Sequence, residues 1–168
     1  MGRIDDACLL TSYLLHNAMS PTFQDLTLPL PQAERMRMGM DVVDIRRISE
    51  SIDKFGARFV QRLFSQGEIS YAQSGEGQTA QRLAARFAAK EAAIKAFNLS
   101  EAGVNWRDIE VQKLPDGACR LALHGKAASQ AQQLGVSEIA LSLSHDGDYA
   151  AAVVTALIAP VPAQRSLF

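Results

Sequence analysis

The chain has 168 residues, a size typical of one domain, and its apolar fraction of 48% is enough for a buried core. The formal net charge of −1 excludes a global basic field of the kind that binds nucleic acid without specificity. Cys8 and Cys119 give neither a disulfide framework nor a metal-binding spacing, and no apolar run has the length of a membrane span, so we expect a cytoplasmic protein with two free thiols.

The sequence pattern divides the chain into three segments. Residues 1–37 are interrupted by prolines and are predicted to be an N-terminal extension, in which residues 7–17 have the composition of a short helix. Residues 38–158 have the regular hydrophobic patterning of a folded domain. Residues 159–168 contain two prolines and are predicted to be a loose C-terminal tail.

The first predicted elements of the domain are one strand and two helices. Met38–Ile45 mixes apolar and β-branched residues over the length of a strand. Within Ile48–Phe64, apolar side chains recur every three or four residues, which indicates a helix. Ser65 and Glu68 fit a capping box that opens a second, shorter helix, and the glycines that follow end it.

The strongest helix prediction covers Thr79–Phe97. This segment is rich in alanine, the best helix former, and its large apolar residues fall on one face. Beyond it, Ile109–Val111 and Arg120–Leu123 flank the turn sequence Pro-Asp-Gly and are predicted to pair as a hairpin.

The last predicted elements are a helix over Lys126–Leu134, ended by Gly135, and a second hairpin formed by Ile139–Leu143 and Tyr149–Leu157. The predicted order is therefore β-α-α-α-β-β-α-β-β. Strands paired mostly by hairpins, with helices on one side, predict a single α+β domain whose sheet is largely antiparallel.

Two carboxylates occupy unusual places in this pattern. Asp41 lies in an otherwise apolar strand, where a carboxylate costs free energy unless it is paired or bound to a metal. Glu91 shares a helix face with Phe87 and Lys95, which puts it near the boundary of the core. Magnesium typically binds one or two carboxylates together with waters and substrate phosphates. The plainer interpretation, a solvated Glu91–Lys95 pair, is the commoner one on composition alone.

Two longer motifs carry a resemblance to a known family. Gly39–Ile48, GMDVVDIRRI, resembles the opening motif of the holo-acyl-carrier-protein synthases, and Arg86–Phe97, RFAAKEAAIKAF, resembles their second motif. Three shorter matches follow in the expected order, at Phe59–Leu63, Trp106–Val111 and Leu141–Ala152. The resemblance runs from Met38 to about Leu157 and leaves residues 1–37 outside.

This resemblance implies the 4′-phosphopantetheinyl transferase fold and the activity of that superfamily. Such an enzyme moves 4′-phosphopantetheine from coenzyme A to a serine of an apo acyl carrier protein, and releases 3′,5′-ADP, for fatty acid or polyketide synthesis. Asp41 and Glu91 match the family's Mg²⁺ ligands. Lys95 matches a lysine near the phosphates and is expected to stabilise the transferring group, which makes Asp41, Glu91 and Lys95 the expected catalytic residues.

The resemblance also implies two sets of binding residues. Four residues are expected to contact coenzyme A: Arg86, Lys90, Lys95 and His145. Four are expected to meet the acidic carrier protein: Arg47, Arg58, Phe59 and Arg62. On charge pattern alone, the arginines also fit a solvated basic helix face, Arg86 and Lys90 fit solvated helix charges, and the histidine fits a structural turn residue.

The resemblance further implies a homo-oligomer, most simply a homotrimer, with active sites between subunits, because a related class of transferases fuses two such halves in one chain and this chain has one. Closed symmetric assembly is the usual outcome of such contacts. The chain departs from the family's Phe-Gly-Thr-Gly loop over Asn98–Gly103, where Glu101 adds negative charge. Two alternatives stay open: a non-catalytic carrier-binding module of the same fold, and a magnesium-dependent phosphohydrolase acting on nucleotides.

Overall fold

The structure is a computed structural model that describes residues 35–159. The predicted short helix over residues 7–17 and nearly all of the predicted tail over residues 159–168 lie outside this range. Strand β1 begins at Arg35, earlier than the predicted domain boundary at residue 38, and it ends at Asp44.

The main sheet has three antiparallel strands in the order β1-β5-β4, so the last strand of the chain is the central one. These are β1 (Arg35–Asp44), β4 (Val136–Asp146) and β5 (Tyr149–Ile158). The β4–β5 hairpin forms as predicted, and both of its strands are longer than predicted. The register sets Asp41 of β1 opposite Ala152 of β5. Successive residues of a strand point to opposite faces, so Asp41 shares the inner face of β1 with buried Gly39 and Val43.

Two helices stand where the sequence predicts one. Helix α2 covers Ile45–Phe55 and helix α3 covers Ala57–Leu63, with Gly56 between them. Gly56 has φ +59°, a conformation that only glycine adopts readily, and this turn separates the two helices. The periodicity of apolar residues continues through the break, which is why it indicated a single helix.

The next two helices match the prediction closely. Helix α4 covers Gln66–Gln73, and the capping box is present, with the Ser65 side chain accepting from the amide of Glu68 and the Glu68 side chain accepting from the amide of Ser65. Helix α5 covers Thr79–Phe97, the predicted bounds. It ends at Asn98, whose left-handed φ of 54° breaks the helical repeat.

The rest of the domain is a small second sheet and one helix. Strands β2 (Ile109–Lys113) and β3 (Cys119–Leu123) form the predicted hairpin after the short 3₁₀ helix η1 (Trp106–Asp108). Helix α6 covers Gly125–Gln133 and leads into β4. The antiparallel pairing and the helices confirm the predicted α+β class.

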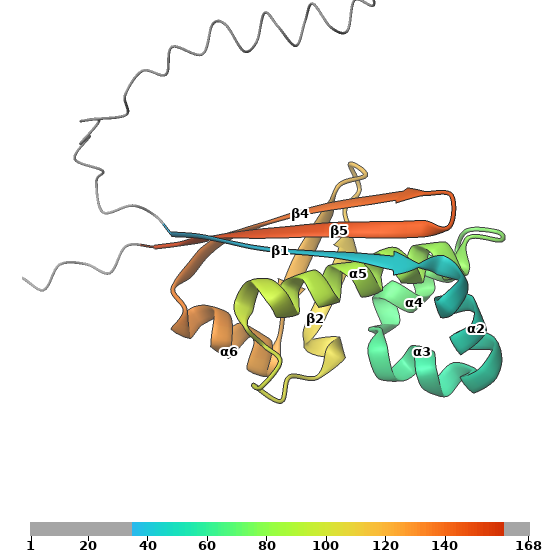
Figure 1. Cartoon of the computed structure of the whole chain (residues 1–168), viewed down its shortest axis with the longest axis horizontal. Helices are drawn as coiled ribbons and strands as arrows, with labels where there is room; N and C mark the ends of the chain where they lie inside the picture. Colours follow the sequence, from blue (N-terminus) through green and yellow to red (C-terminus); the bar gives the residue numbers. More distant parts are fainter. Residues whose placement is uncertain (1–34, 160–168) are drawn as a thin grey trace, which may run out of the picture. The chain divides into compact units, whose positions relative to one another are not determined.

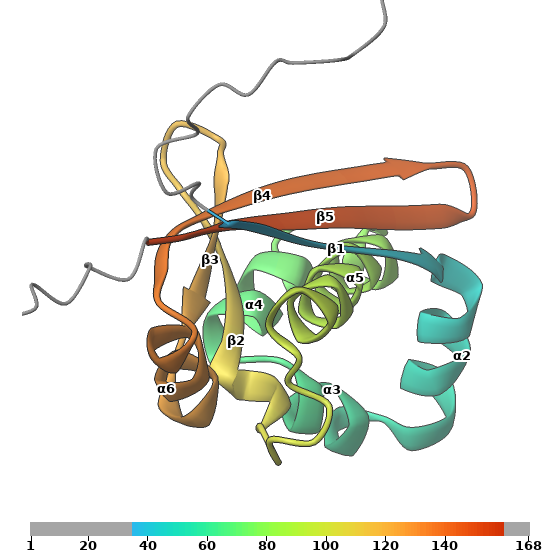
Figure 2. The same cartoon turned by 60° about the vertical axis from the view of Figure 1, so that its left-hand side comes forward.

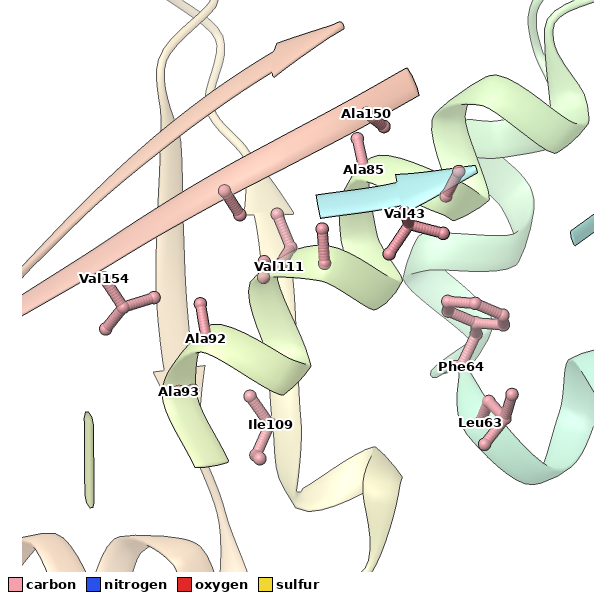
Figure 3. Packing of buried hydrophobic residues seen from close by; sticks show 14 of the residues in the cluster. Val43, Leu63, Phe64, Ala85, Ala92, Ala93, Ile109, Val111, Ala150 and Val154 are labelled. Carbon is pink, nitrogen blue, oxygen red and sulfur yellow. The ribbon is translucent and has the colours of Figure 1, made fainter. Parts of the chain in front are cut away.

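Helix α5 is the centre of the fold. In Figures 1 and 2 it runs along one face of the β1-β5-β4 sheet, with α2, α3 and α4 beside it. Alanines of α5 face β5, and Figure 3 shows Ala85 close to Ala150 and Ala92 on the side of Val154. Burial extends around most of α5 rather than along the one stripe that its large apolar residues predicted.

Gly39 permits the close approach of β1 to α5. A β-carbon at this position would lie 2.0 Å from the carbonyl oxygen of Ala92 and 2.8 Å from the amide nitrogen of Ala96. Both are backbone atoms and cannot turn aside. The contact between strand and helix is therefore a main-chain contact, and it brings the inner face of β1 against the face of α5 that carries the site.

Candidate active site

Strand β1 and helix α5 bring together the three residues predicted to be catalytic. Lys95 Nζ lies 2.7 Å from Asp41 Oδ1 and also donates to the carbonyl oxygen of Met40 at 3.0 Å. The Asp41 side chain is 19% exposed and the Lys95 side chain is 51% exposed. The cost of placing a carboxylate in an apolar strand is thus partly offset by its ion pair with Lys95.

Glu91 faces the same space as Asp41. Both residues line one cavity of about 440 Å³, with Arg47 of α2 and Phe59 of α3 on its wall. Burial raises the pKa of Glu91, the negative charge of Asp41 raises it further, and Lys95 opposes the shift. Glu91 therefore lies where a second negative charge is disfavoured unless a cation accompanies it.

The two carboxylates fit a magnesium ion in their chemistry. Hard oxygen ligands and an unfavourable carboxylate pair both favour a bound cation, and Lys95 already places one positive charge on Asp41. Among residues 35–159, no group of three or more His, Cys, Asp or Glu side chains forms a complete metal cage. Such a two-carboxylate site suits an ion whose remaining ligands are waters and substrate phosphates.

A second cavity opens on the other side of Glu91. It has a volume of about 280 Å³ and is lined by Glu91, Ile94, Leu99, Ser100, Gly103, Val104 and Trp106. Its wall includes the loop that departs from the family pattern. Leu99 is buried and its amide donates to Ile94, so this loop is anchored to α5, while Glu101 is exposed to solvent.

Arg86 and His145 share a third cavity, of about 490 Å³, which has no lining residue in common with the Asp41–Glu91 cavity. Arg86 is 3% exposed, and its Nε and Nη2 have no hydrogen-bond partner, while its guanidinium stacks 4.1 Å from the ring of Tyr71. Burial lowers the pKa of Arg86. His145 Nδ1 lies 2.9 Å from Nε2 of Gln81 at the exposed rim.

Lys90 is not where the resemblance placed it. Its ammonium is 0% exposed and lies 2.9 Å from Oε2 of Glu68, which is also 0% exposed. Burial lowers the pKa of Lys90, and the charge of Glu68 opposes that shift. The contact between Lys90 and coenzyme A stays a prediction, and in this structure the side chain instead lies in the core between α4, α5 and β2.

The predicted carrier-binding residues lie on α2 and α3. Arg47, Arg58 and Arg62 are exposed, and Phe59 is half-buried. Arg47 and Phe59 line the Asp41–Glu91 cavity, whereas the other two arginines do not. Of the three arginines, Arg47 therefore lies in the same cavity as the carboxylates.

Sequence reasoning missed the anchoring of α2 beside the site. Asp44 caps this helix by accepting from the amide of Arg46, and the Arg46 guanidinium bonds both carboxylate oxygens of Asp44, at 3.1 and 2.9 Å. These hydrogen bonds lower the pKa of Asp44. An aspartate just before a helix is an N-cap signal, and the predicted strand, which ran to Ile45, concealed it. Phe87, read as part of the apolar stripe, also lines the cavity.

No helix within residues 35–159 combines the length and the apolar character needed to cross a membrane.

Comparison with known proteins places the chain in a family. The sequence profile of the 4′-phosphopantetheinyl transferase superfamily matches residues 37–154. A holo-(acyl-carrier-protein) synthase of Koribacter versatilis is 47% identical over 117 residues, which cover 69% of this chain and 93% of that protein. The synthase of Geobacter sulfurreducens is 43% identical over 117 residues, which cover 69% of this chain and 92% of that protein.

Solved structures give the same result for the fold. The complex of the Chronobacterium ammoniagenes synthase with coenzyme A is 38% identical, has a TM-score of 0.65, and covers 73% of this chain and 97% of that one. The Helicobacter pylori synthase in complex with coenzyme A is 28% identical, has a TM-score of 0.62, and covers 71% of this chain and 98% of that one. With its sequence motifs, its fold and its paired carboxylates, the chain belongs to the 4′-phosphopantetheinyl transferase superfamily and, within it, to the holo-(acyl-carrier-protein) synthases.

Proposed function

We propose that this chain transfers the 4′-phosphopantetheine group of coenzyme A to a serine of an apo acyl carrier protein, giving the holo carrier and 3′,5′-ADP. The observation that carries the proposal is the cavity of about 440 Å³ that Asp41 and Glu91 line together, with Arg47 on its wall. A non-catalytic binding module has no need for a carboxylate whose pKa is raised by burial and by a second carboxylate.

The reaction exchanges one phosphorus–oxygen bond for another. The serine oxygen of the carrier bonds to the phosphorus next to pantetheine, the bond from that phosphorus to the bridging oxygen breaks, and 3′,5′-ADP leaves with the electron pair. The serine proton passes to a site carboxylate or to a water molecule beside it. Lys95, 51% exposed at the cavity edge, can turn from Asp41 towards the phosphate oxygens and stabilise the negative charge that grows there.

Asp41 and Glu91 are proposed to hold a magnesium ion. When bound, this ion would neutralise the charge of the coenzyme A diphosphate and align it for attack. Asp41 presents its carboxylate from a strand whose backbone is fixed against α5 at Gly39, and Glu91 presents its own from α5 itself. Neither carboxylate therefore depends on a loop for its position.

The remaining charges are proposed to bind the two substrates. Arg47, Arg58 and Arg62 would meet the acidic carrier, with Phe59 as an apolar contact at the mouth of the cavity. Arg86 and His145 would meet a phosphate of coenzyme A, and the unpartnered Nε and Nη2 of Arg86 support this assignment. A buried guanidinium with two free donors is satisfied by an anion more readily than by any neutral group.

The working unit is proposed to be a homotrimer with shared active sites. The cavity of Asp41 and the cavity of Arg86 have no lining residue in common, so one copy offers the metal site and the phosphate site as separate surfaces. In addition, the outward face of β1 exposes four large apolar side chains in a row, Met36, Met38, Met40 and Val42. Such a patch on a sheet face is typical of a protein–protein contact.

We also propose a cytoplasmic setting and a role in fatty acid or polyketide synthesis. Cys119 is a free thiol that lines the Arg86 cavity, which fits a reducing compartment. Carrier proteins modified in this way serve those two kinds of synthesis.

Incubation of the purified protein with coenzyme A, magnesium chloride and an apo acyl carrier protein, followed by intact-mass spectrometry, tests the proposal. The expected result is a carrier heavier by one phosphopantetheine group and an equal amount of 3′,5′-ADP, with neither product in excess EDTA. A carrier that binds but keeps its mass would instead favour the binding module. Cleavage of a nucleotide diphosphate without any change in the carrier would favour the phosphohydrolase.

A further inference from the structure

A fully buried ion pair lies next to the stripe of α5 that carries Glu91. Lys90 Nζ and Glu68 Oε2 are 2.9 Å apart, and both side chains are 0% exposed. The pair joins α5 to α4, and it is outside the Asp41–Glu91 cavity, whose lining includes neither residue. The transfer reaction as proposed above makes no use of it.

Each polar atom of the pair has a defined partner. Lys90 Nζ donates to Glu68 and to the carbonyl oxygens of Trp106 and Ile109, which uses all three hydrogens of the ammonium. Glu68 Oε1 accepts from the amide of Val111 at 3.0 Å, and Oε2 accepts from the amide of Ser65 at 2.8 Å. The network thus connects α5 with the start of α4, with η1 and with β2.

A buried ion pair is a poor device for stability alone. The cost of removing two charges from water often exceeds their attraction, and a well-packed apolar pair of the same volume is frequently as stable. Buried polar pairs are best attested as devices that select one register or one arrangement of packed elements. The Lys90–Glu68 pair is therefore better explained by a role in positioning the elements that it joins.

The packing of helix α5 leaves its position weakly defined. Its buried surface is largely alanine: Ala84, Ala85, Ala88, Ala89, Ala92, Ala93 and Ala96. Methyl groups make a smooth surface with few projecting side chains to interlock, so packing alone defines the rotation and axial position of the helix weakly. A lysine that donates to three fixed oxygens defines both.

The position of α5 matters because Lys90 immediately precedes Glu91. The sheet side of the helix is held by the close contact at Gly39, and the opposite side is held by Lys90. Between these two contacts lies the half-open stripe that carries Glu91 and Lys95. A shift of α5 would change the distance from Glu91 to Asp41, which is fixed on β1.

We propose that Lys90 and Glu68 are positioning residues, and that their buried pair sets the rotation and axial position of α5 so that Glu91 meets Asp41 at the separation a divalent ion requires. This inference rests on the proposed function for the identity of the ion site. It assigns to Lys90 a role inside the core in place of the coenzyme A contact.

The test replaces the pair by uncharged side chains of similar size, Lys90→Met with Glu68→Gln, and uses Glu68→Gln alone as the second variant. Folding is measured by circular dichroism and thermal unfolding. Manganese(II) binding to the free protein is measured by electron paramagnetic resonance, independently of transfer. Lys126→Met, on the exposed face of α6, is the matched control.

The expected double variant unfolds cooperatively but binds manganese(II) about tenfold to a hundredfold more weakly, the range seen when groups that orient metal ligands are removed. Its kcat falls about a hundredfold, as for a small misplacement of reacting groups, while the KM for the carrier is unchanged because α2 and α3 are untouched. The control keeps wild-type manganese(II) affinity and kcat.

Wild-type manganese(II) affinity and kcat in a folded double variant would overturn the inference. Loss of the folded state in both variants would overturn it as well, because the pair would then hold the domain together rather than place one helix. Failure of the wild-type protein to bind manganese(II) or to modify a carrier would instead refute the proposed function, so the two failures are distinguishable.

Discussion

Lys95 Nζ lies 2.7 Å from Asp41 Oδ1 and joins the end of α5 to β1 across the mouth of the site. One oxygen of Asp41 is therefore already neutralised by a positive charge. A divalent ion that binds Asp41 meets this ammonium as a neighbour of like charge, and the two cations compete for the same carboxylate.

Replacing Lys95 by Met is expected to separate metal binding from transfer. Manganese(II) affinity of the free protein should rise by up to about fivefold, since an exposed ion pair is worth at most about 1 kcal/mol. The kcat for transfer should fall about a hundredfold or more, as when one stabilising donor is removed from a transition state. Electron paramagnetic resonance and the mass assay measure the two effects. Weaker manganese(II) binding in the variant would contradict competition at Asp41.

Glu91→Gln is expected to abolish magnesium-dependent transfer and to leave the fold intact. Burial and Asp41 raise the pKa of Glu91, so the folded protein holds its proton more tightly than the unfolded chain does. Ionised Glu91 therefore opposes folding as pH rises, and the variant should melt no lower than wild type in metal-free neutral buffer.

Differential scanning calorimetry with and without magnesium chloride checks this prediction, with Glu76→Gln on an exposed loop as the control. Magnesium should raise the Tm of wild type and of the control but not that of Glu91→Gln. Equal stabilisation of all three proteins would refute the assignment of Glu91 as a ligand.

Acid stability is expected to depend on Glu110. A hydrogen bond from Ser65 lowers the pKa of Glu110, and contacts with Gln112 and His124 lower it further. The folded state therefore binds fewer protons here than the unfolded state, so this contribution is present above the ordinary glutamate pKa of about 4.3 and is lost as pH falls through the lower folded value.

Thermal unfolding of wild type and Glu110→Gln between about pH 3 and 6 measures that contribution. The difference in Tm between the two proteins should be largest near about pH 6 and should shrink towards about pH 3. A difference that stays constant over this range would show that Glu110 does not titrate with folding.

Carrier docking is expected to be electrostatic. Arg58→Glu or Arg62→Glu should raise the KM for the carrier about fivefold to tenfold. Each substitution removes an exposed ion pair with the acidic carrier and adds a repulsion of similar size between two negative charges. The KM for coenzyme A should stay nearly unchanged, and added salt should weaken carrier binding. Arg107→Glu, which makes the same charge change on η1, is the control. Carrier binding that is independent of salt would argue against this helix face.

The assembly is expected to use the outward face of β1. Met38 is 64% exposed, and Met38→Glu puts a charge in the middle of the apolar row, so it should convert the proposed trimer into monomers without transfer activity. Light scattering across a dilution series, with Phe55→Glu as the control at an exposed apolar residue elsewhere, gives the answer. A monomer with full activity would refute the shared site.

The sequence was sufficient where local chemistry decides the structure. The alanine-rich α5 and the Ser65–Glu68 capping box were predicted with their positions, because helix propensity and capping are local effects. The break at Gly56 was missed, since apolar periodicity survives a change of direction. Asp41 and Glu91 are conspicuous from their places in an apolar strand and beside an apolar helix stripe, but the motif resemblance was needed to prefer a magnesium site over a solvated Glu91–Lys95 pair.

Lys90 shows why the rest could not be predicted. A lysine in a helix usually reaches solvent, so its burial depends on a distant partner, here Glu68. The local hint of burial was the alanine-rich surrounding sequence, Ala88, Ala89, Ala92 and Ala93. Glu68 had already been explained by its capping role, and its second role in the core has no local pattern.

The main-chain contact at Gly39 makes the close approach of the Asp41 strand to the Glu91 helix depend on a missing side chain. A methyl group at this position would push β1 away from α5 while every ligand, cation and docking residue stayed in the sequence. An inactive protein would then carry a complete set of functional residues. Charged residues alone are therefore not enough to judge whether such a chain is active. Gly39 also has to be considered, because it contributes by having no side chain.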